Sequence, residues 1–250
     1  MSLPDPRVKT VHKVTPPFEL NCFPKGFLSK LGAELVYLMA TKTSYSLEGN
    51  EWEEIFAHCV GAEWKPSNVG LDDVQLSNTC CWGAKTVKAS GDLRTQKRVR
   101  LISGRNSPVY SYQKQDYLSM DPSELGSLVL NIWNERVSGV RRQFKFVRTV
   151  VLVKGKNFDE FSVFETDTLR YDPSLYTWRW NSRDNLEGFD AHGQHRFTWQ
   201  PHGSQFTIVE DIPSDALYFA VRRPQRLDKA AVLKGVGFQE DWIQKRNVCS

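Results

Sequence analysis

The chain has 250 residues, a length that fits one large domain or two small ones. Hydrophobic types make up 40% of the sequence and charged types 25%, a composition that excludes disorder of the whole chain. Lysine and arginine number 33 against 29 acidic residues, so the net charge of +4 excludes a continuous polybasic surface. An anionic partner is still allowed if the basic residues gather in space.

Neither targeting signals nor structural cysteines are evident in the sequence. The first residues carry scattered charges and prolines without the apolar core of a secretory signal, and no run approaches the roughly 20 apolar residues of a membrane span. The five cysteines contain no CxxC pair, and adjacent Cys80 and Cys81 would face opposite sides of a strand. We therefore expect no disulfide framework, no zinc knuckle, no membrane partner and a cytoplasmic location.

Local patterns in the first half of the chain predict an arm, two helices and three strands. Several prolines indicate an extended arm, and apolar residues spaced by three and four, such as Trp52, Ile55 and Phe56, indicate helices. A Ser77-Asn78 turn separates the first two strands. The expected elements are the arm over residues 1–26, helices over 27–41 and 48–60, and strands over 70–76, 79–87 and 98–104.

The second half begins with the clearest helix, residues 123–142. Asp121 and Ser123 suit its N-terminal end, and Arg141 and Arg142 suit its C-terminal end. A nearly continuous apolar run follows, typical of a strand covered on both faces. From residue 171 onward, aromatic residues alternate with Arg and His, which predicts short strands. The strands expected by position are residues 146–153, 161–164 and 217–221.

The most informative stretch for chemistry is the hairpin over residues 70–88. It places Asp73 near the end of one strand and Lys85 near the end of the next. A carboxylate can hold a divalent metal against a phosphate oxygen, and a lysine beside it can orient the attacking water. This spacing also arises by accident in solvated hairpins with ordinary surface charges.

The order of elements, together with Asp73 and Lys85, resembles the PD-(D/E)XK nuclease superfamily, best known from type II restriction endonucleases. The resemblance covers roughly half of the chain. It implies an α/β (α+β) fold in which residues 27–170 form an αβββαβ core with a mixed sheet, its meander running over residues 70–104. Residues 171–250 would form a β-rich region that grips DNA.

The resemblance also implies roles for individual residues. Asp73 matches the metal-binding aspartate and Lys85 the catalytic lysine. Glu53, which follows Trp52 on the predicted helix, resembles an aromatic–Glu pair that supplies an auxiliary metal ligand. Mg²⁺ is the expected cofactor, with Mn²⁺ as a substitute.

The sequence departs from the family pattern at Gly83, two residues before Lys85, where the family has Asp or Glu. Three explanations are open. In the first, which we favour, the second acid has moved to the helix, to Glu53 or less favourably to Glu51 or Glu54.

In the second explanation, Gln75 completes the metal site through its side-chain carbonyl, because it lies two residues after Asp73 on the same strand face. In the third, the chain has no cleavage activity. The candidate catalytic residues are therefore Asp73, Lys85, Glu53 and Gln75, with Asp73 and Glu53 as metal ligands.

Two further segments carry donors suited to DNA. The first is the shaped loop after the third strand, and the second is the aromatic and basic region near the C-terminus; both also fit ordinary structural roles. His192, His195 and His202 have poor spacing for a zinc site. The candidate DNA contacts are Arg105, Asn106, Ser107, Tyr110, Arg179, Arg183, Arg196, Gln200, His202 and Gln205.

The expected function is a Mg²⁺-dependent type II restriction endonuclease that cleaves double-stranded DNA, by analogy as a homodimer. No phosphate-binding loop is present, so no nucleotide cofactor is expected. A non-catalytic DNA-binding protein and a protein- or RNA-interaction domain are the alternatives. Basic residues dominate residues 85–105 and 136–148, whereas acids gather at 48–54 and 72–73, which predicts a basic stripe beside an acidic pocket.

Overall fold

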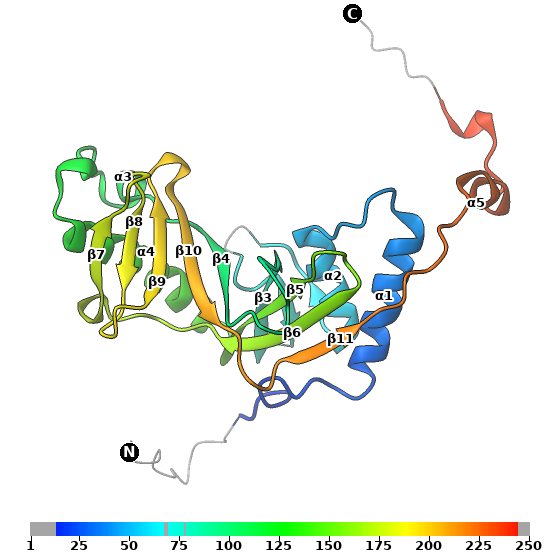
Figure 1. Cartoon of the computed structure of the whole chain (residues 1–250), viewed down its shortest axis with the longest axis horizontal. Coiled ribbons are helices and arrows are strands. Elements are labelled where there is room, and N and C mark those ends of the chain that lie inside the picture. The colour runs from blue at the N-terminus through cyan, green and yellow to red at the C-terminus, as the bar shows by residue number, and fades with distance from the viewer. Residues whose placement is uncertain (1–13, 68–69, 78, 245–250) are drawn as a thin grey trace, which may run out of the picture.

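The computed structural model describes residues 14–67, 70–77 and 79–244 and shows an elongated molecule built on two sheets (Figure 1). The first sheet has the order β1-β2-β3-β5-β6-β11, with bounds Glu63–Trp64, Val74–Leu76, Cys80–Lys88, Phe146–Lys154, Glu160–Asp167 and Leu217–Ala220. The second has the order β4-β10-β9-β8-β7, with bounds Arg98–Arg105, Gln205–Asp211, His195–Gln200, Leu186–Phe189 and Thr177–Trp180. Paired strands are antiparallel apart from β3 and β5, which are parallel.

Two helices, α1 (Phe27–Thr41) and α2 (Gly49–Val60), cover one face of the first sheet. Their buried residues have the helical spacing predicted from the sequence, and they form one core with Trp82 of β3. The α2 N-terminus is held by the Glu51 side chain, which accepts a hydrogen bond of 2.8 Å from the Glu48 backbone N–H. These contacts fix the helix that carries the candidate acid Glu53.

The connection from β3 to its parallel neighbour β5 carries β4, α3 and α4, the helices spanning Pro108–Tyr112 and Pro122–Arg141. Helix α4 lies between the two sheets, where Trp133 shares a buried cluster with Cys81 of β3 and Phe197 of β9. Cys80 instead packs with α1 and α2. The two cysteines thus face opposite sides of β3, and the cysteines of the described segments are free thiols.

Trp178 of β7 packs tightly against both α4 and the neighbouring strand β8. A Cβ atom built on Gly126 of α4 would lie 2.2 Å from the indole, and one on Gly188 of β8 would lie 2.9 Å from it. The ring of Phe197 stacks on that of Trp178 with 5.7 Å between centroids. The two glycines therefore allow the helix and the sheet to approach each other around one tryptophan.

The structure confirms a mixed α/β architecture, but one strand of the predicted core is misplaced. The prediction that residues 98–104 complete a meander with the preceding hairpin is wrong, because β4 pairs with β10 in the second sheet. The place beside β3 is taken by β5, whose residues 150–153 are all buried. A strand that alternates Val99 and Leu101 with exposed arginines can cover only one face, whereas β5 suits the sheet interior.

The β-rich region predicted from residue 171 onward also differs in its connections. β4 precedes it in sequence yet lies in the second sheet, and β11 follows it yet returns to the first. Beyond β11 the chain forms an arm with a short helix, α5 (Lys229–Gly235). Single-turn 3-10 helices span Tyr117–Ser119, Pro173–Leu175, His202–Ser204 and Glu240–Trp242.

Residues 14–26 contain no regular helix or strand, in keeping with the predicted arm, whereas residues 1–13 and Asn78 lie outside the described residues. Among the described helices, none has the length and apolar character needed to cross a bilayer.

Candidate functional site

The structure brings Asp73 and Lys85 together on the first sheet. Asp73 directly precedes β2, and Lys85 lies in the middle of β3, the antiparallel partner of β2. The distance from Lys85 Nζ to Asp73 Oδ2 is 4.0 Å, and Asp73 is 3% exposed. A buried carboxylate and a half-buried ammonium group therefore face each other.

The hydrogen bonds around this pair are incomplete. Asp73 Oδ1 accepts a hydrogen bond of 3.3 Å from the Ser67 backbone N–H, while the buried Oδ2 accepts none from the described residues. Lys85 Nζ donates to the Gly70 carbonyl at 3.0 Å. A buried acceptor without a donor is costly, which marks Oδ2 as an acceptor that still needs a donor or a cation.

Burial dominates the electrostatics of both groups. It raises the pKa of Asp73 to about 6, an effect that Lys85 opposes and Glu53 reinforces. Burial also lowers the pKa of Lys85, against the pull of Asp73 and Glu53. The site therefore holds a carboxylate and an amine whose charged forms are both less favoured than in water.

Of the three helix acids considered, Glu53 alone couples to the pair. Its side chain accepts a hydrogen bond of 3.1 Å from Trp64 Nε1, and its charge acts on both Asp73 and Lys85. Glu51 is used elsewhere, since it caps α2 and pairs with Lys42 at 2.6 Å.

Two other predicted site residues are placed differently. Glu54 lines a separate groove between α1 and α2. The half-buried Gln75 side chain donates its amide hydrogen to the Asp72 carbonyl at 3.2 Å.

The close packing at Gly83 leaves no room for the acid that the resemblance would place there. A Cβ atom on Gly83 would lie 2.8 Å from the Gly70 carbonyl oxygen and 3.1 Å from Leu71 Cα. The backbone before Asp73 thus occupies the space that an acidic side chain would need. Within the described segments, no three His, Cys, Asp or Glu side chains gather into a metal site.

An open groove of about 420 Å³ runs from Lys85, which lies next to the buried Asp73, to the second sheet. Lys85 lines one side, Arg105 of β4 lies on the other, and Arg136 of α4 contributes its guanidinium. Arg136 donates to the Ser103 carbonyl at 2.7 Å, and burial lowers its pKa. The sequence alone identifies Arg136 only as a member of a basic run. Arg136 lies one helical turn after the buried Trp133, and this spacing is the signal in the sequence that its side chain points inward.

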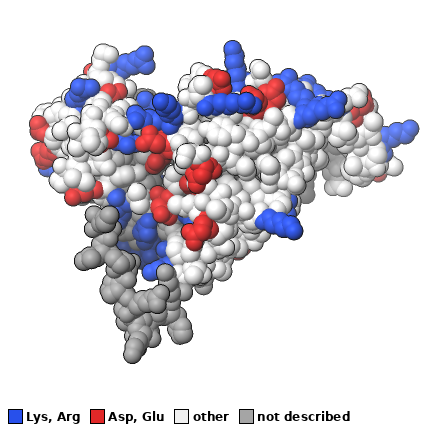
Figure 2. All heavy atoms as spheres, turned by 60° about the horizontal axis from the view of Figure 1, so that its bottom comes forward, with Lys and Arg blue, Asp and Glu red and all other residues white. Residues whose placement is uncertain are grey.

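The predicted basic stripe is not continuous, because several of its members form ion pairs. Arg94 pairs with Glu160, Arg98 with Asp211 and Arg148 with Glu165. On the face shown in Figure 2, basic and acidic side chains are interspersed. Lys85, Arg105 and Arg136 nevertheless bring three basic side chains together at the groove.

Several candidate DNA contacts do share one end of the second sheet. Strand register aligns Arg105 of β4, Gln205 of β10 and Gln200 of β9 in one row. His202 lies in the turn that joins β9 to β10, and Arg183 lies in the turn after β7, which opens at the same end. Tyr110, on α3 directly after β4, is 90% exposed.

The remaining candidates lie elsewhere or are used internally. Asn106 is fully buried, where it donates to the Val129 carbonyl and accepts from Arg136, so the predicted base contact does not fit. Ser107 caps α3 by accepting a hydrogen bond from the Tyr110 backbone N–H.

The two remaining arginines are engaged in other contacts. Arg196 sits at the opposite end of β9 and is paired with Asp190 and Asp211. Arg179 lies over the ring of Phe189, 4.1 Å from its centroid.

The three histidines do not form a cluster. His192 lies in the turn before β9 and His202 in the turn after it, so the length of the strand separates them.

Comparison of the chain with protein-family models, with curated proteins and with solved structures yields no match. Its function must therefore be inferred from the geometry of the site.

Proposed function

We propose that this chain is a Mg²⁺-dependent endonuclease acting on double-stranded DNA, and more narrowly a type II restriction endonuclease. The observation that carries the proposal is the buried Asp73 carboxylate, 4.0 Å from Lys85 Nζ, beside a groove that also bears Arg105 and Arg136. A buried acid paired with a lysine at a basic groove is an arrangement suited to phosphodiester hydrolysis.

The residues present fit a metal ion bound mainly by substrate and solvent. Mg²⁺ commonly takes only one or two protein carboxylates and completes its shell with water and phosphate oxygens. Asp73, whose Oδ2 accepts no hydrogen bond from the described residues, and Glu53 would hold it. When bound, the ion supplies Lewis-acid polarisation of the phosphate and lowers the pKa of water.

The chain's own groups account for the other requirements. Arg105 and Arg136 bind the phosphate and keep the scissile bond over Asp73. Lys85, whose pKa is lowered by burial, orients the attacking water and offsets the charge that develops on the phosphate. Because the pKa of Asp73 is about 6, its carboxylate is charged at pH 8 and increasingly protonated below pH 6.

The shared end of the second sheet supports the choice of a duplex substrate. Arg105 belongs both to the groove and to the row formed with Gln205 and Gln200. A ribbon end bearing amides and a cation can read base edges while the groove holds the backbone.

The proposal is tested by incubating the full chain and its variants with varied duplex DNA and Mg²⁺ or Mn²⁺. Asp73→Asn and Lys85→Ala should each reduce cleavage by at least about 100-fold while DNA binding persists. Glu53→Gln should reduce it strongly, and its neighbour Glu54→Gln, which lines another groove, should not. Intact DNA with the wild-type chain under all these conditions would contradict the catalytic proposal.

A second candidate, a non-catalytic DNA-binding protein, is favoured by one observation, the lack of space for an acid at Gly83. It predicts salt-sensitive duplex binding that needs no divalent ion. Binding without cleavage, unchanged by Asp73→Asn and weakened by Arg105→Ala, would support this candidate over the nuclease.

A further inference from the structure

The C-terminal arm after β11 carries an unusual set of exposed apolar side chains. Every residue from 226 to 244 is exposed. The rings of Phe238 and Trp242 lie 5.8 Å apart, with Glu240 and Asp241 between them in sequence. The large exposed apolar side chains are Leu227 at 53%, Val232 at 44%, Leu233 at 36%, Val236 at 58%, Phe238 at 39%, Trp242 at 61% and Ile243 at 72%.

Contacts with Asp159, Ala40 and Tyr45 hold the start of this arm in place as the chain leaves β11 of the first sheet. The Val221 backbone N–H donates to the Asp159 carbonyl, and the Leu227 backbone N–H donates to the Ala40 carbonyl at 2.9 Å. Arg223 and Arg226 both lie over the ring of Tyr45. Beyond these anchors the arm projects from the body of the molecule, as Figure 1 shows for α5.

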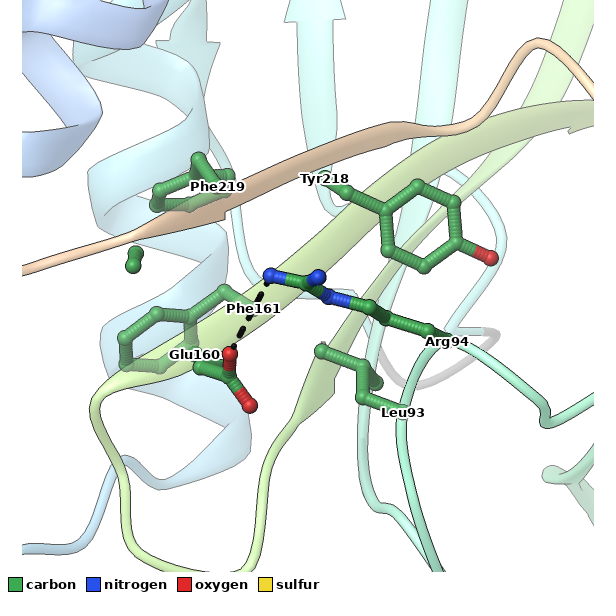
Figure 3. A pocket seen from close by; sticks show the side chains of 7 residues that line it. Leu93, Arg94, Glu160, Phe161, Tyr218 and Phe219 are labelled. Carbon is green, nitrogen blue, oxygen red and sulfur yellow. Dashed lines mark ion pairs between the residues drawn. The ribbon is translucent and has the colours of Figure 1, made fainter.

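A pocket of about 370 Å³ lies at the edge of the first sheet where the arm begins (Figure 3). It is lined by Leu93, Phe161, Tyr218 and Phe219, and it is crossed by the side chain of Arg94. Arg94 is paired with Glu160 at 3.6 Å, but its side chain is 77% exposed. The pocket thus offers an apolar lining together with an accessible guanidinium.

We propose that the arm end, Phe238–Ile243, of one copy of this chain occupies the pocket of a second copy. Phe238 and Trp242 match the apolar lining, and Glu240 and Asp241 match Arg94 in charge. The anchors that carry the arm away from β11 favour the pocket of another molecule over its own. Two reciprocal insertions make a closed, two-fold symmetric dimer.

The test measures the mass of the full chain by sedimentation over roughly 1 to 100 µM, because self-association depends on concentration. The wild-type chain should form dimers. Trp242→Ala should weaken dimerisation about 30-fold, as expected for a buried interface tryptophan. Tyr37→Ala, which removes another exposed aromatic ring outside the arm and pocket, should leave the mass unchanged.

Charge reversal identifies the partner of the arm. Arg94→Glu alone and the double change Glu240→Arg/Asp241→Arg alone should each give monomers, whereas Arg183→Glu, an exposed site on the second sheet, should not. An equimolar mixture of the two reversed chains restores opposite charges in both pockets, so it should form heterodimers.

Three results would overturn the proposal. They are a monomeric wild-type chain throughout the concentration range, dimers that survive both charge reversals, and a mixture that stays monomeric. The experiment needs no DNA or metal ion, so its outcome is independent of the proposed nuclease activity.

Discussion

The two sheets differ in whether their charged side chains are buried or exposed. The first sheet buries them: Asp73, Arg148 and Glu165 are each at most 3% exposed. The second sheet buries aromatic side chains against α4 and keeps its ion pairs at the surface, where Arg98 and Asp211 are about half exposed. Because burying a charge is expensive unless it is paired, charged groups retained in the first sheet call for a specific reason.

That reason differs for the buried groups. Glu165 accepts hydrogen bonds from Trp82 and Arg148, and Arg148 also donates to the Phe18 carbonyl, which ties the N-terminal arm to the sheet. Asp73 has no such network, since its Oδ2 accepts no hydrogen bond from the described residues. Glu165, whose two carboxylate oxygens both accept hydrogen bonds, is therefore structural, and the incompletely satisfied acid Asp73 is the better candidate for function.

The largest expected effect comes from breaking the buried pair. Arg148→Met should lower the free energy of unfolding by about 3–5 kcal/mol, because Glu165 would remain buried without its partner. Arg98→Met, which breaks the exposed pair with Asp211, should cost only about 0–1 kcal/mol. Urea unfolding of both variants measures the difference, and equal losses would show that the two sheets do not differ in this way.

Asp73→Asn should stabilise the metal-free protein at pH 8 by up to about 3 kcal/mol. Burial raises the pKa of Asp73 from its ordinary value of 3.8 to about 6, so the folded state binds this proton more tightly than the unfolded state. Stability is therefore lost as the pH rises from about 4 to about 6, and the full penalty persists above that range. Thermal unfolding at pH 4 and pH 8 should show the gain only at the higher pH.

Asp211→Asn in the second sheet is the matched control with the opposite sign. Burial tends to raise the pKa of Asp211, but hydrogen bonds from Arg196 and Arg98 outweigh burial and lower this pKa. Ionised Asp211 therefore stabilises the folded state above pH 3.8. This stabilisation is small because the side chain is half exposed, so Asp211→Asn should lower the free energy of unfolding only slightly at pH 8. A stabilising effect there would contradict the contrast with Asp73.

Gly126→Ala tests the packing of the second sheet and should cost about 1–3 kcal/mol, because the new methyl group would overlap the Trp178 ring. Gly32→Ala, in the interior of α1 with no atom within 4 Å of the added carbon, should instead stabilise by about 0.5–1 kcal/mol. Denaturant unfolding of the two variants gives the comparison. A similar increase in the free energy of unfolding for both variants would mean that the Trp178 ring shifts at little cost to make room for the methyl group.

The smallest expected effect separates the two ends of the second sheet. Arg105→Ala should weaken duplex binding modestly and reduce the slope of log affinity against log salt by about 1. Arg196→Ala, at the opposite end and paired with two aspartates, should leave both quantities nearly unchanged. Fluorescence anisotropy with a labelled duplex at several salt concentrations measures both, and equal effects would argue against a DNA contact at the predicted end.

Features that depend on neighbouring residues were predictable without a structure. The spacing of apolar residues located α1 and α2, the capping and charged residues located α4 within one residue at each end, and the apolar run located β5. The alternation of side chains along a strand also placed Cys80 and Cys81 on opposite faces. These features follow from helix and strand periodicity, which acts over a few residues.

Features that depend on contacts between distant residues required the folded structure. The partner of β4, the closeness of Gly70 to Gly83 and the position of Arg136 join segments that local patterns do not relate. Among the helix acids, the resemblance favoured Glu53, but only the structure shows that its charge acts on Asp73 and Lys85 while Glu51 and Glu54 lie elsewhere. Strand pairing and close approach are set by how the whole core fills space, and the pattern of any one segment is compatible with several such arrangements.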